Sequence, residues 1–152
     1  MEENLYFAYG SNLDLEQMAQ RCPDAEIVGP VRLENYELRF RGSGFATVAP
    51  KKGSVVYGLV WKLTPNCEQS LDRYEGYPRF YRRDYVQTGE IFDALTGRVV
   101  SSSASAMIYL MQPGHPLGLP SGVYWQTCLQ GYRDFHFDPA VLRQALKDSA
   151  PQ

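Results

Sequence analysis

The chain has 152 residues, 44% of them hydrophobic, and its 15 lysines and arginines against 17 aspartates and glutamates give a net charge of −2. This length suits one compact domain with a substantial core. The near-neutral mixture of charges excludes a strongly basic nucleic-acid-binding protein, though not a small local patch. No apolar run approaches the roughly 18 residues that cross a membrane. We therefore expect neither nucleic acid nor a membrane as a partner.

The cysteines indicate a reducing compartment. Cys22, Cys67 and Cys128 lie far apart and in no metal-ligand spacing. An odd number of cysteines without a signal peptide is typical of reduced, buried thiols in a cytoplasmic protein. We expect no disulfide and no bound metal.

The first predicted element is a buried strand over residues 5–9, where apolar and aromatic residues follow one another. The turn residues 10–12 end it, and Asn12 or Asp14 can cap a short helix over residues 14–21. A β-rich stretch follows. Its predicted strands and turns are strand 26–30, strand 36–40, turn 42–44, strand 45–49, turn 50–53 and strand 54–63.

Thr64 and Pro65 predict a second helix, because a hydroxyl stands at the cap and proline at the first helical position. That helix should end before Gly76. The elements predicted after it are strands 81–88 and 97–111 around a turn region 90–96, a loop 113–120, a helix from Ser121 to Tyr132, a helix from Asp138 to Lys147 and a frayed tail 148–152.

The order of these elements predicts the fold class. Strands and short helices are mixed without regular β-α alternation, which favours an α+β domain over a doubly wound sheet. We expect a single domain over residues 1–152, with its core at about 5–135 and a C-terminal helix at 138–147.

The turn after the first strand is the first candidate site. Gly10 allows a tight turn and a close approach of a ligand, and the amides at the following helix start favour an anion or an oxyanion. Ser11 and Asn12 add side-chain donors at the same place. For an isolated Gly-Ser-Asn tripeptide, an ordinary capped turn explains the pattern better.

Glu75 is the second candidate. Cys67, Leu71 and Tyr74 share one face of the predicted helix, and Glu75 stands at the edge of that face. A carboxylate that loses solvation there has a raised pKa and can act as a general acid or base, and Asp72 could add like-charge repulsion. Most helical glutamates are solvated, so periodicity alone favours a surface residue.

The third candidate is the helix start at Ser121, where Tyr124 in the first turn can point its hydroxyl toward a pocket or simply pack in the core. The arginines at 79, 82 and 83 can hold a carboxylate, although a solvated strand edge is the default. The chain has no nucleophile elbow, phosphate-binding loop or dinucleotide fingerprint.

Residues 6–13, Tyr-Phe-Ala-Tyr-Gly-Ser-Asn-Leu, resemble the signature of the gamma-glutamylcyclotransferases. Further segments of the same family follow in order, so the resemblance extends over roughly residues 5–132. These segments are Tyr-Gly-Leu-Val-Trp-Lys-Leu at 57–63, Ser-Leu-Asp-x-x-Glu-Gly at 70–76, Tyr81, Tyr-Leu-Met at 109–111 and Pro-Ser-x-x-Tyr at 120–124.

The resemblance implies a small closed mixed β-barrel with short helices around it, and a reaction that needs no cofactor. The α-amino group of a γ-glutamyl substrate attacks its own γ-carbonyl and gives 5-oxoproline and a free amine or amino acid. The protein must orient the substrate, remove a proton from the ammonium and stabilise the oxyanion.

The residue roles implied by the resemblance concern one catalytic side chain and a substrate pocket. Glu75 matches the catalytic glutamate of the family, and Tyr81 and Tyr124 match pocket walls. The remaining matches form the substrate cradle and are Tyr9, Gly10, Ser11, Asn12 and Leu13.

The segment 77–80, Tyr-Pro-Arg-Phe, departs from the family pattern and puts the leaving-group side of the pocket in doubt. The Gly-Ser-Asn turn resembles the enzymes that act on γ-glutamyl amino acids more than the γ-glutamylamine group. Two alternatives stay open: a specialised γ-glutamyl deprotecting enzyme and a non-catalytic small-molecule-binding domain. The chain is expected to be a monomer or a homodimer paired through an exposed strand or the last helix.

Overall fold

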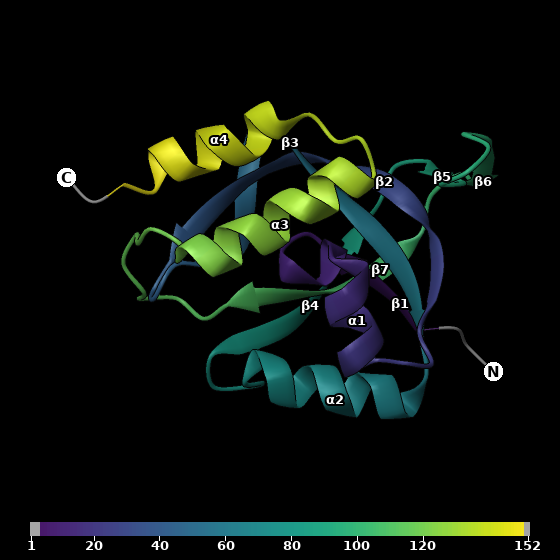
Figure 1. The fold of residues 1–152 in the computed structure, drawn as a ribbon, viewed down its shortest axis with the longest axis horizontal. Coiled ribbons are helices and arrows are strands. Elements are labelled where there is room, and N and C mark those ends of the chain that lie inside the picture. The colour runs from purple at the N-terminus through teal and green to yellow at the C-terminus, as the bar shows by residue number, and fades with distance from the viewer. Residues whose placement is uncertain (1–3, 151–152) are drawn as a thin grey trace.

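The computed structural model describes residues 4–150 of the chain. It has an α+β fold, as predicted, in which helices surround a mixed five-stranded sheet (Figure 1). The elements in chain order are β1 (Asn4–Ala8), the single 3₁₀ turn η1 (Ser11–Leu13), α1 (Leu15–Arg21), β2 (Glu26–Arg41), β3 (Phe45–Leu63), α2 (Pro65–Glu75), β4 (Tyr81–Gln87), β5 (Ile91–Phe92), β6 (Val99–Ser101), β7 (Ser105–Met111), α3 (Gly122–Asp134) and α4 (Pro139–Asp148).

The sheet has the strand order β2-β3-β1-β7-β4, and β5 and β6 form a separate two-stranded sheet. The apolar β1 lies in the middle, antiparallel to β3 and parallel to β7. Among residues 4–150 no hydrogen-bonded pairing joins the outer strands β2 and β4, so closure into a barrel stays a prediction. The Met111 amide donates to Thr47 Oγ1 at 3.0 Å, which brings the end of β7 to the start of β3.

The predicted strands 26–30 and 36–40 are one strand, β2, and the predicted strands 45–49 and 54–63 are one strand, β3. The expected turn at 50–53 falls in a multi-residue bulge of β3, because Glu34 pairs with Val55 and Tyr36 with Pro50, which leaves residues 51–54 opposite Asn35 alone. The side chain of Asn35 accepts a hydrogen bond from the Gly53 amide at 3.0 Å and stabilises this bulge.

The predicted strand 97–111 divides into β6 and β7, which belong to different sheets. The division falls in the serine-rich stretch between them. There the Thr88 amide donates to the Ala104 carbonyl at 2.8 Å and the chain turns from the small sheet into the large one.

The predicted helix starts are confirmed by their caps. The side chain of Asp14 accepts from two amides at the start of α1, and Thr64, Ser121 and Asp138 cap α2, α3 and α4 in the same way. The expected fraying from residue 148 is wrong for Ser149, which is fully buried and accepts from the Phe40 amide at 2.8 Å. Residues 151–152 lie outside the described part of the chain.

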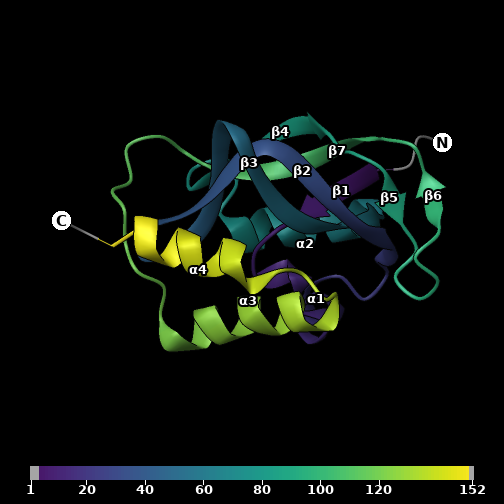
Figure 2. The ribbon, with the colours of Figure 1, turned by 90° about the horizontal axis from the view of Figure 1, so that it is seen from above.

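Helices lie at opposite edges of the molecule (Figure 1). Figure 2 shows α3 and α4 together on one side of the strands, and in Figure 1 α2 lies at the opposite edge of the molecule.

Cys22, Cys67 and Cys128 are free and buried, as predicted. None of the helices in residues 4–150 is long and apolar enough to cross a membrane.

Candidate functional site

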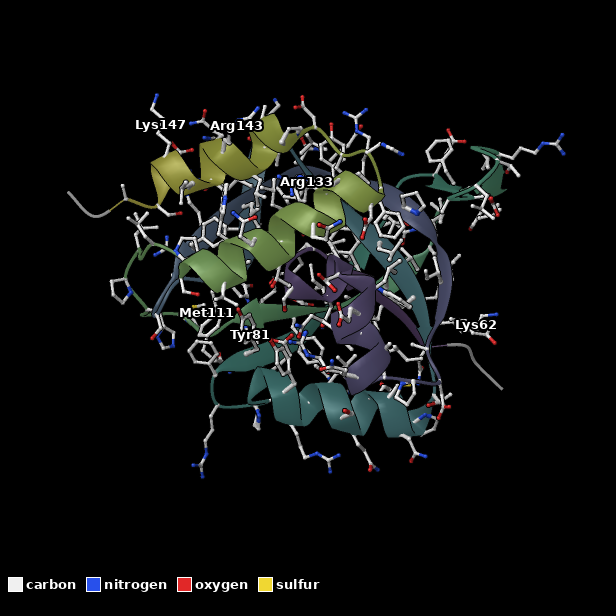
Figure 3. All side chains as sticks on the ribbon, in the orientation of Figure 1. Lys62, Tyr81, Met111, Arg133, Arg143 and Lys147 are labelled. Atoms are coloured by element: carbon white, nitrogen blue, oxygen red, sulfur yellow. The ribbon has the colours of Figure 1, made fainter. Side chains whose placement is uncertain are left out.

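A cavity of about 660 Å³, including the part that opens to solvent, lies where the turn after β1, the end of α2 and the starts of β3, β4 and α3 meet. Its walls are mostly aromatic rings with a few polar groups, which is typical of small-molecule sites. In the view of Figure 3, Tyr81 lies between α2 below and α3 above. The lining residues are Tyr6, Tyr9, Gly10, Ser11, Asn12, Phe45, Ala46, Tyr74, Glu75, Phe80, Tyr81, Tyr109 and Tyr124.

The structure brings together all but one of the predicted site residues. Leu13 alone of that set lies outside the lining, although the sequence had placed it in the substrate cradle. Its side chain is fully buried against α3, where a Cβ on Gly131 would lie 2.3 Å from the Leu13 Cβ. Leu13 therefore packs η1 onto α3.

The turn residues 10–12, here called the glycine loop, form the polar side of the cavity. Gly10 lies close to the start of α3, because an added Cβ would meet Tyr124 Oη at 3.1 Å. Ser11 and Asn12 are buried, and Asn12 Nδ2 donates to Tyr6 Oη at 2.9 Å. The loop is thus held from both sides where it lines the cavity.

Arg21, the last residue of α1, supports the glycine loop from behind. Its guanidinium donates to Ser11 Oγ at 3.2 Å and to Asn12 Oδ1, and also to Gln17 Oε1 at 2.7 Å. It also lies over the Tyr74 ring, 3.5 Å from the centroid. A single cation therefore connects the loop to the end of α2.

Glu75 is the last residue of α2 and is half-buried in the cavity. Helix α2 ends there because Gly76 adopts a left-handed conformation with φ of 67°. Burial raises the pKa of the Glu75 carboxyl to about 7, and the nearby positive charge of Arg21 opposes that rise. Glu75 can therefore both accept and donate a proton near neutral pH.

Asp72 does not repel Glu75 as the sequence suggested. Its carboxylate accepts from Arg83 Nε at 2.9 Å and from Tyr109 Oη at 2.6 Å, so its charge is compensated by these two partners. Arg83 accordingly forms an ion pair inside the fold and is not part of a free basic edge.

Three tyrosines, Tyr9, Tyr81 and Tyr124, use their hydroxyls to shape the cavity. Tyr9 Oη donates to the Tyr109 carbonyl at 2.6 Å, and Tyr81 Oη donates to the Ala46 carbonyl at 2.6 Å. Tyr124 Oη accepts from the Ala46 amide at 3.1 Å. Burial raises the pKa of all three well above the usual value, so they stay neutral near pH 7. Glu75 is then the group suited to proton transfer.

Some residues that line the cavity were not predicted as site residues from the sequence. They are Tyr6, Phe45, Ala46, Tyr74, Phe80 and Tyr109. Tyr74 was expected on the apolar face of α2 with Cys67 and Leu71, but it is 45% exposed at the rim. The position of Tyr74 beside Glu75 was a usable signal. Phe45 and Phe80 carry no such signal, because they meet only when β3 and the turn before β4 pack together.

The cavity shows no donor set for a metal. Across residues 4–150, His, Cys, Asp and Glu side chains form no group of three that could hold an ion. The expectation that no cofactor is needed stays a prediction that rests on the family chemistry.

A family described as gamma-glutamyl cyclotransferase, AIG2-like, matches residues 6–127 of the chain. The chain belongs to this family. The matched range contains the glycine loop, Glu75, Tyr81 and Tyr124, so the resemblance seen in the sequence is confirmed.

Individual relatives agree with the family assignment. The chain is 39% identical over 85 residues to human gamma-glutamylcyclotransferase and 38% identical over 85 residues to the bovine protein of the same name. Each match covers 49% of this chain and 45% of the relative, so the chain spans about half the length of these relatives. A solved structure described as a gamma-glutamyl cyclotransferase superimposes with a TM-score of 0.76 at 28% identity, covering 99% of this chain and 90% of that one.

Proposed function

We propose that the protein is a gamma-glutamylcyclotransferase that converts γ-glutamyl amino acids or amines to 5-oxoproline and the released amine. The observation that carries the proposal is a carboxyl group, Glu75, with a pKa of about 7 in the same cavity as the glycine loop. The human and bovine relatives carry the name of this activity.

The reaction begins with the glutamyl end of the substrate against the glycine loop, residues 10–12. The Glu75 carboxylate accepts a proton from the α-ammonium group, and the free amine attacks the γ-carbonyl carbon. Because nucleophile and electrophile belong to one molecule, the protein supplies mainly orientation. Tyr9, Tyr81 and Tyr124 hold the substrate in the bent conformation that this ring closure requires.

The attack forms a tetrahedral centre whose oxyanion is stabilised by donors of the glycine loop. Protonated Glu75 then gives its proton to the leaving nitrogen. The bond between the γ-carbon and that nitrogen breaks, the α-nitrogen loses its second surplus proton to water, and 5-oxoproline and a neutral amine are released. A carboxyl group with a pKa of about 7 suits both steps, because its two protonation states are similarly populated near neutral pH.

The test is release of 5-oxoproline from γ-Glu-Ala, γ-Glu-ε-Lys, glutathione and a γ-glutamyl amine by the wild type and by Glu75→Gln. We expect turnover of at least one substrate and a loss of about 10²- to 10⁴-fold in kcat in the variant, the range for a positioned general acid or base. Binding of the substrate to Glu75→Gln, measured by calorimetry, controls for the fold of the pocket. Unchanged turnover in Glu75→Gln would show that the assigned mechanism is wrong.

A further inference from the structure

Phe45 and Phe80 form an aromatic wall at the outer part of the cavity. Their ring centroids are 6.0 Å apart and their planes are perpendicular. The Phe45 ring also contacts Tyr124 at 5.2 Å, and the Phe80 ring contacts Tyr81 at 5.1 Å. Phe45 is 39% exposed although it lines the cavity, so the wall faces the opening to solvent.

The aromatic wall lies beside the proposed base and beyond the residues that touch the glycine loop. An added Cβ on Gly76, the residue after Glu75, would lie 3.1 Å from the Phe80 Cβ. Tyr124 separates the two sides, since its hydroxyl lies against Gly10 and its ring against Phe45. A substrate with its glutamyl end at the loop and its scissile bond at Glu75 therefore extends its leaving group along the wall.

Backbone contacts hold both rings in place. The Phe80 amide donates to the Gly76 carbonyl at 2.9 Å, and its carbonyl accepts from the Gln112 amide at 2.9 Å. The turn before Phe45 is packed under the loop that precedes α3, because an added Cβ on Gly44 would lie 2.2 Å from the Leu119 carbonyl oxygen. The wall is thus preorganised, which lowers the cost of ordering a bound group.

The cavity lining offers no cation to a charged leaving group. Glu75 is the only charged side chain among the lining residues. The nearby guanidinium groups of Arg21 and Arg83 are bound to the glycine loop and to Asp72. A leaving group with its own carboxylate meets no cation in this lining, whereas an apolar ring gains contact and loses water.

We propose that the leaving group of the natural substrate is an aromatic or other large apolar amine or amino acid, held by Phe45 and Phe80. The proposal rests on the proposed cyclotransferase function and specifies its substrate class. The chemistry is unchanged: the γ-carbon–nitrogen bond breaks, the α-nitrogen replaces the leaving nitrogen, and Glu75 returns the proton. The divergent segment 77–80 then serves to place Phe80 at the leaving group.

The experiment compares kcat/KM within two pairs of substrates. The first pair, γ-Glu-Phe and γ-Glu-Ala, tests the effect of an aromatic ring on a leaving group that carries a carboxylate. The second pair, γ-glutamyl-benzylamine and γ-glutamyl-methylamine, tests the ring on a leaving group without a carboxylate. We expect the aromatic member of each pair to be preferred about 10- to 100-fold, in line with the discrimination that a hydrophobic pocket achieves. γ-Glu-ε-Lys, which brings a charged leaving group, should be the poorest substrate.

Variants of the two phenylalanines test whether the preference for aromatic leaving groups comes from the aromatic wall. In Phe45→Ala and Phe80→Ala the aromatic preference should fall toward unity, mainly through a higher KM for the aromatic substrates. Phe45→Ala is suited to this test because Phe45 is partly exposed and its truncation leaves no closed cavity in the core. Phe92→Ala, on the small β5–β6 sheet and 36% exposed, is the matched control and should keep the wild-type preference.

The outcomes separate the two proposals. If γ-Glu-Ala is cleaved by the wild type but both pairs give ratios near one or below, the leaving-group proposal is wrong and the cyclotransferase function stands. The same holds if the preference persists in both Phe variants. If no substrate of the panel yields 5-oxoproline, the cyclotransferase function itself is wrong, and the leaving-group proposal falls with it.

Discussion

The glycine-loop side and the aromatic side of the cavity are built in different ways. The loop and the arginine behind it come from one short segment between β1 and the end of α1, and polar contacts hold them. The aromatic wall joins the first residue of β3 to the turn before β4, and ring packing together with backbone contacts between distant segments holds it. One side is thus encoded locally, whereas the other exists only in the folded chain.

The two sides also differ in what they offer a ligand. The loop side provides the polar residues Ser11 and Asn12, which suits the glutamyl part that every substrate of the proposed reaction shares. The aromatic side provides apolar contact without charge, which suits a part that can vary between substrates. Glu75 lies where the sides meet, so perturbing each side should leave a different experimental signature.

The largest expected effect concerns the stability of Glu75→Gln. The Glu75 pKa is about 7 in the folded protein against an ordinary value of 4.5, so the folded state binds the proton more tightly and stability decreases as pH rises from about 4.5 to 7. Glutamine removes this penalty. Allowing for partial exposure, we expect Glu75→Gln to be about 2 kcal/mol more stable than wild type at pH 8 and nearly equal at pH 4.

Urea unfolding at the two pH values measures this difference. A variant that is equally stable or less stable at pH 8 would show that Glu75 is not desolvated in the folded protein. Glu90→Gln, at an exposed position between β4 and β5, is the control for the same change of a carboxylate to an amide and should leave stability near wild type.

Asn12→Ala tests the loop side at its buried contacts. It leaves Tyr6 Oη without its donor from Asn12 and removes one acceptor of Arg21. We expect a loss of about 1 to 2 kcal/mol in the free energy of unfolding, because buried polar groups lose their partners. Thermal and urea unfolding report the change, with exposed Asn66→Ala on α2 as the control that should stay near wild type. Equal stability of both variants would mean that the loop does not depend on this network.

The same contrast explains how much could be predicted from the sequence. Helix starts were predicted because Asp14, Thr64 and Ser121 cap through residues two or three positions away. The turn at residues 50–53 was misread because Asn35, from the neighbouring strand, converts it into a bulge. A local pattern can be interpreted from the sequence when the hydrogen-bond partner is a few residues away. A partner on another element is not visible in the sequence.

The same distinction between local partners and partners on other elements applies to the candidate site. Gly10, Ser11 and Asn12 are consecutive, so the loop and its resemblance to the family were visible. The desolvation of Glu75 depends on which elements cover the end of α2, and periodicity could place it only at the edge of an apolar face. The pairing of Asp72 with Arg83 likewise needs β4 beside α2.

Gly10→Ala tests how closely the loop approaches α3. The added Cβ would meet Tyr124 Oη at 3.1 Å and Ala46 Cβ at 3.4 Å, so the loop or the tyrosine must shift by a few tenths of an ångström. We expect kcat/KM to fall about tenfold, since small misplacements of a positioned substrate are costly. In the double variant Gly10→Ala/Tyr124→Phe the missing hydroxyl relieves the contact, and part of the activity should return.

The measurement for Gly10→Ala is a double-mutant cycle on kcat/KM with γ-Glu-Ala. Tyr124→Phe alone also loses the acceptor of the Ala46 amide and serves as the second single variant. Additive losses, without any recovery in the double variant, would show that the close approach of Tyr124 does not limit the loop.

Arg21→Met has the smallest expected effect and joins the two sides, because Arg21 holds the glycine loop and lies over Tyr74. Its positive charge lowers the pKa of Glu75, so removing it should raise that pKa further and shift the acid limb of the kcat/KM profile to higher pH. Activity should decrease several-fold at pH 6 and little at pH 9. Arg143→Met on α4, where the arginine is exposed, is the charge-matched control. A uniform loss at every pH would mean that Arg21 acts by holding the loop alone, whereas a shifted limb shows that one side chain both positions the loop and tunes the base.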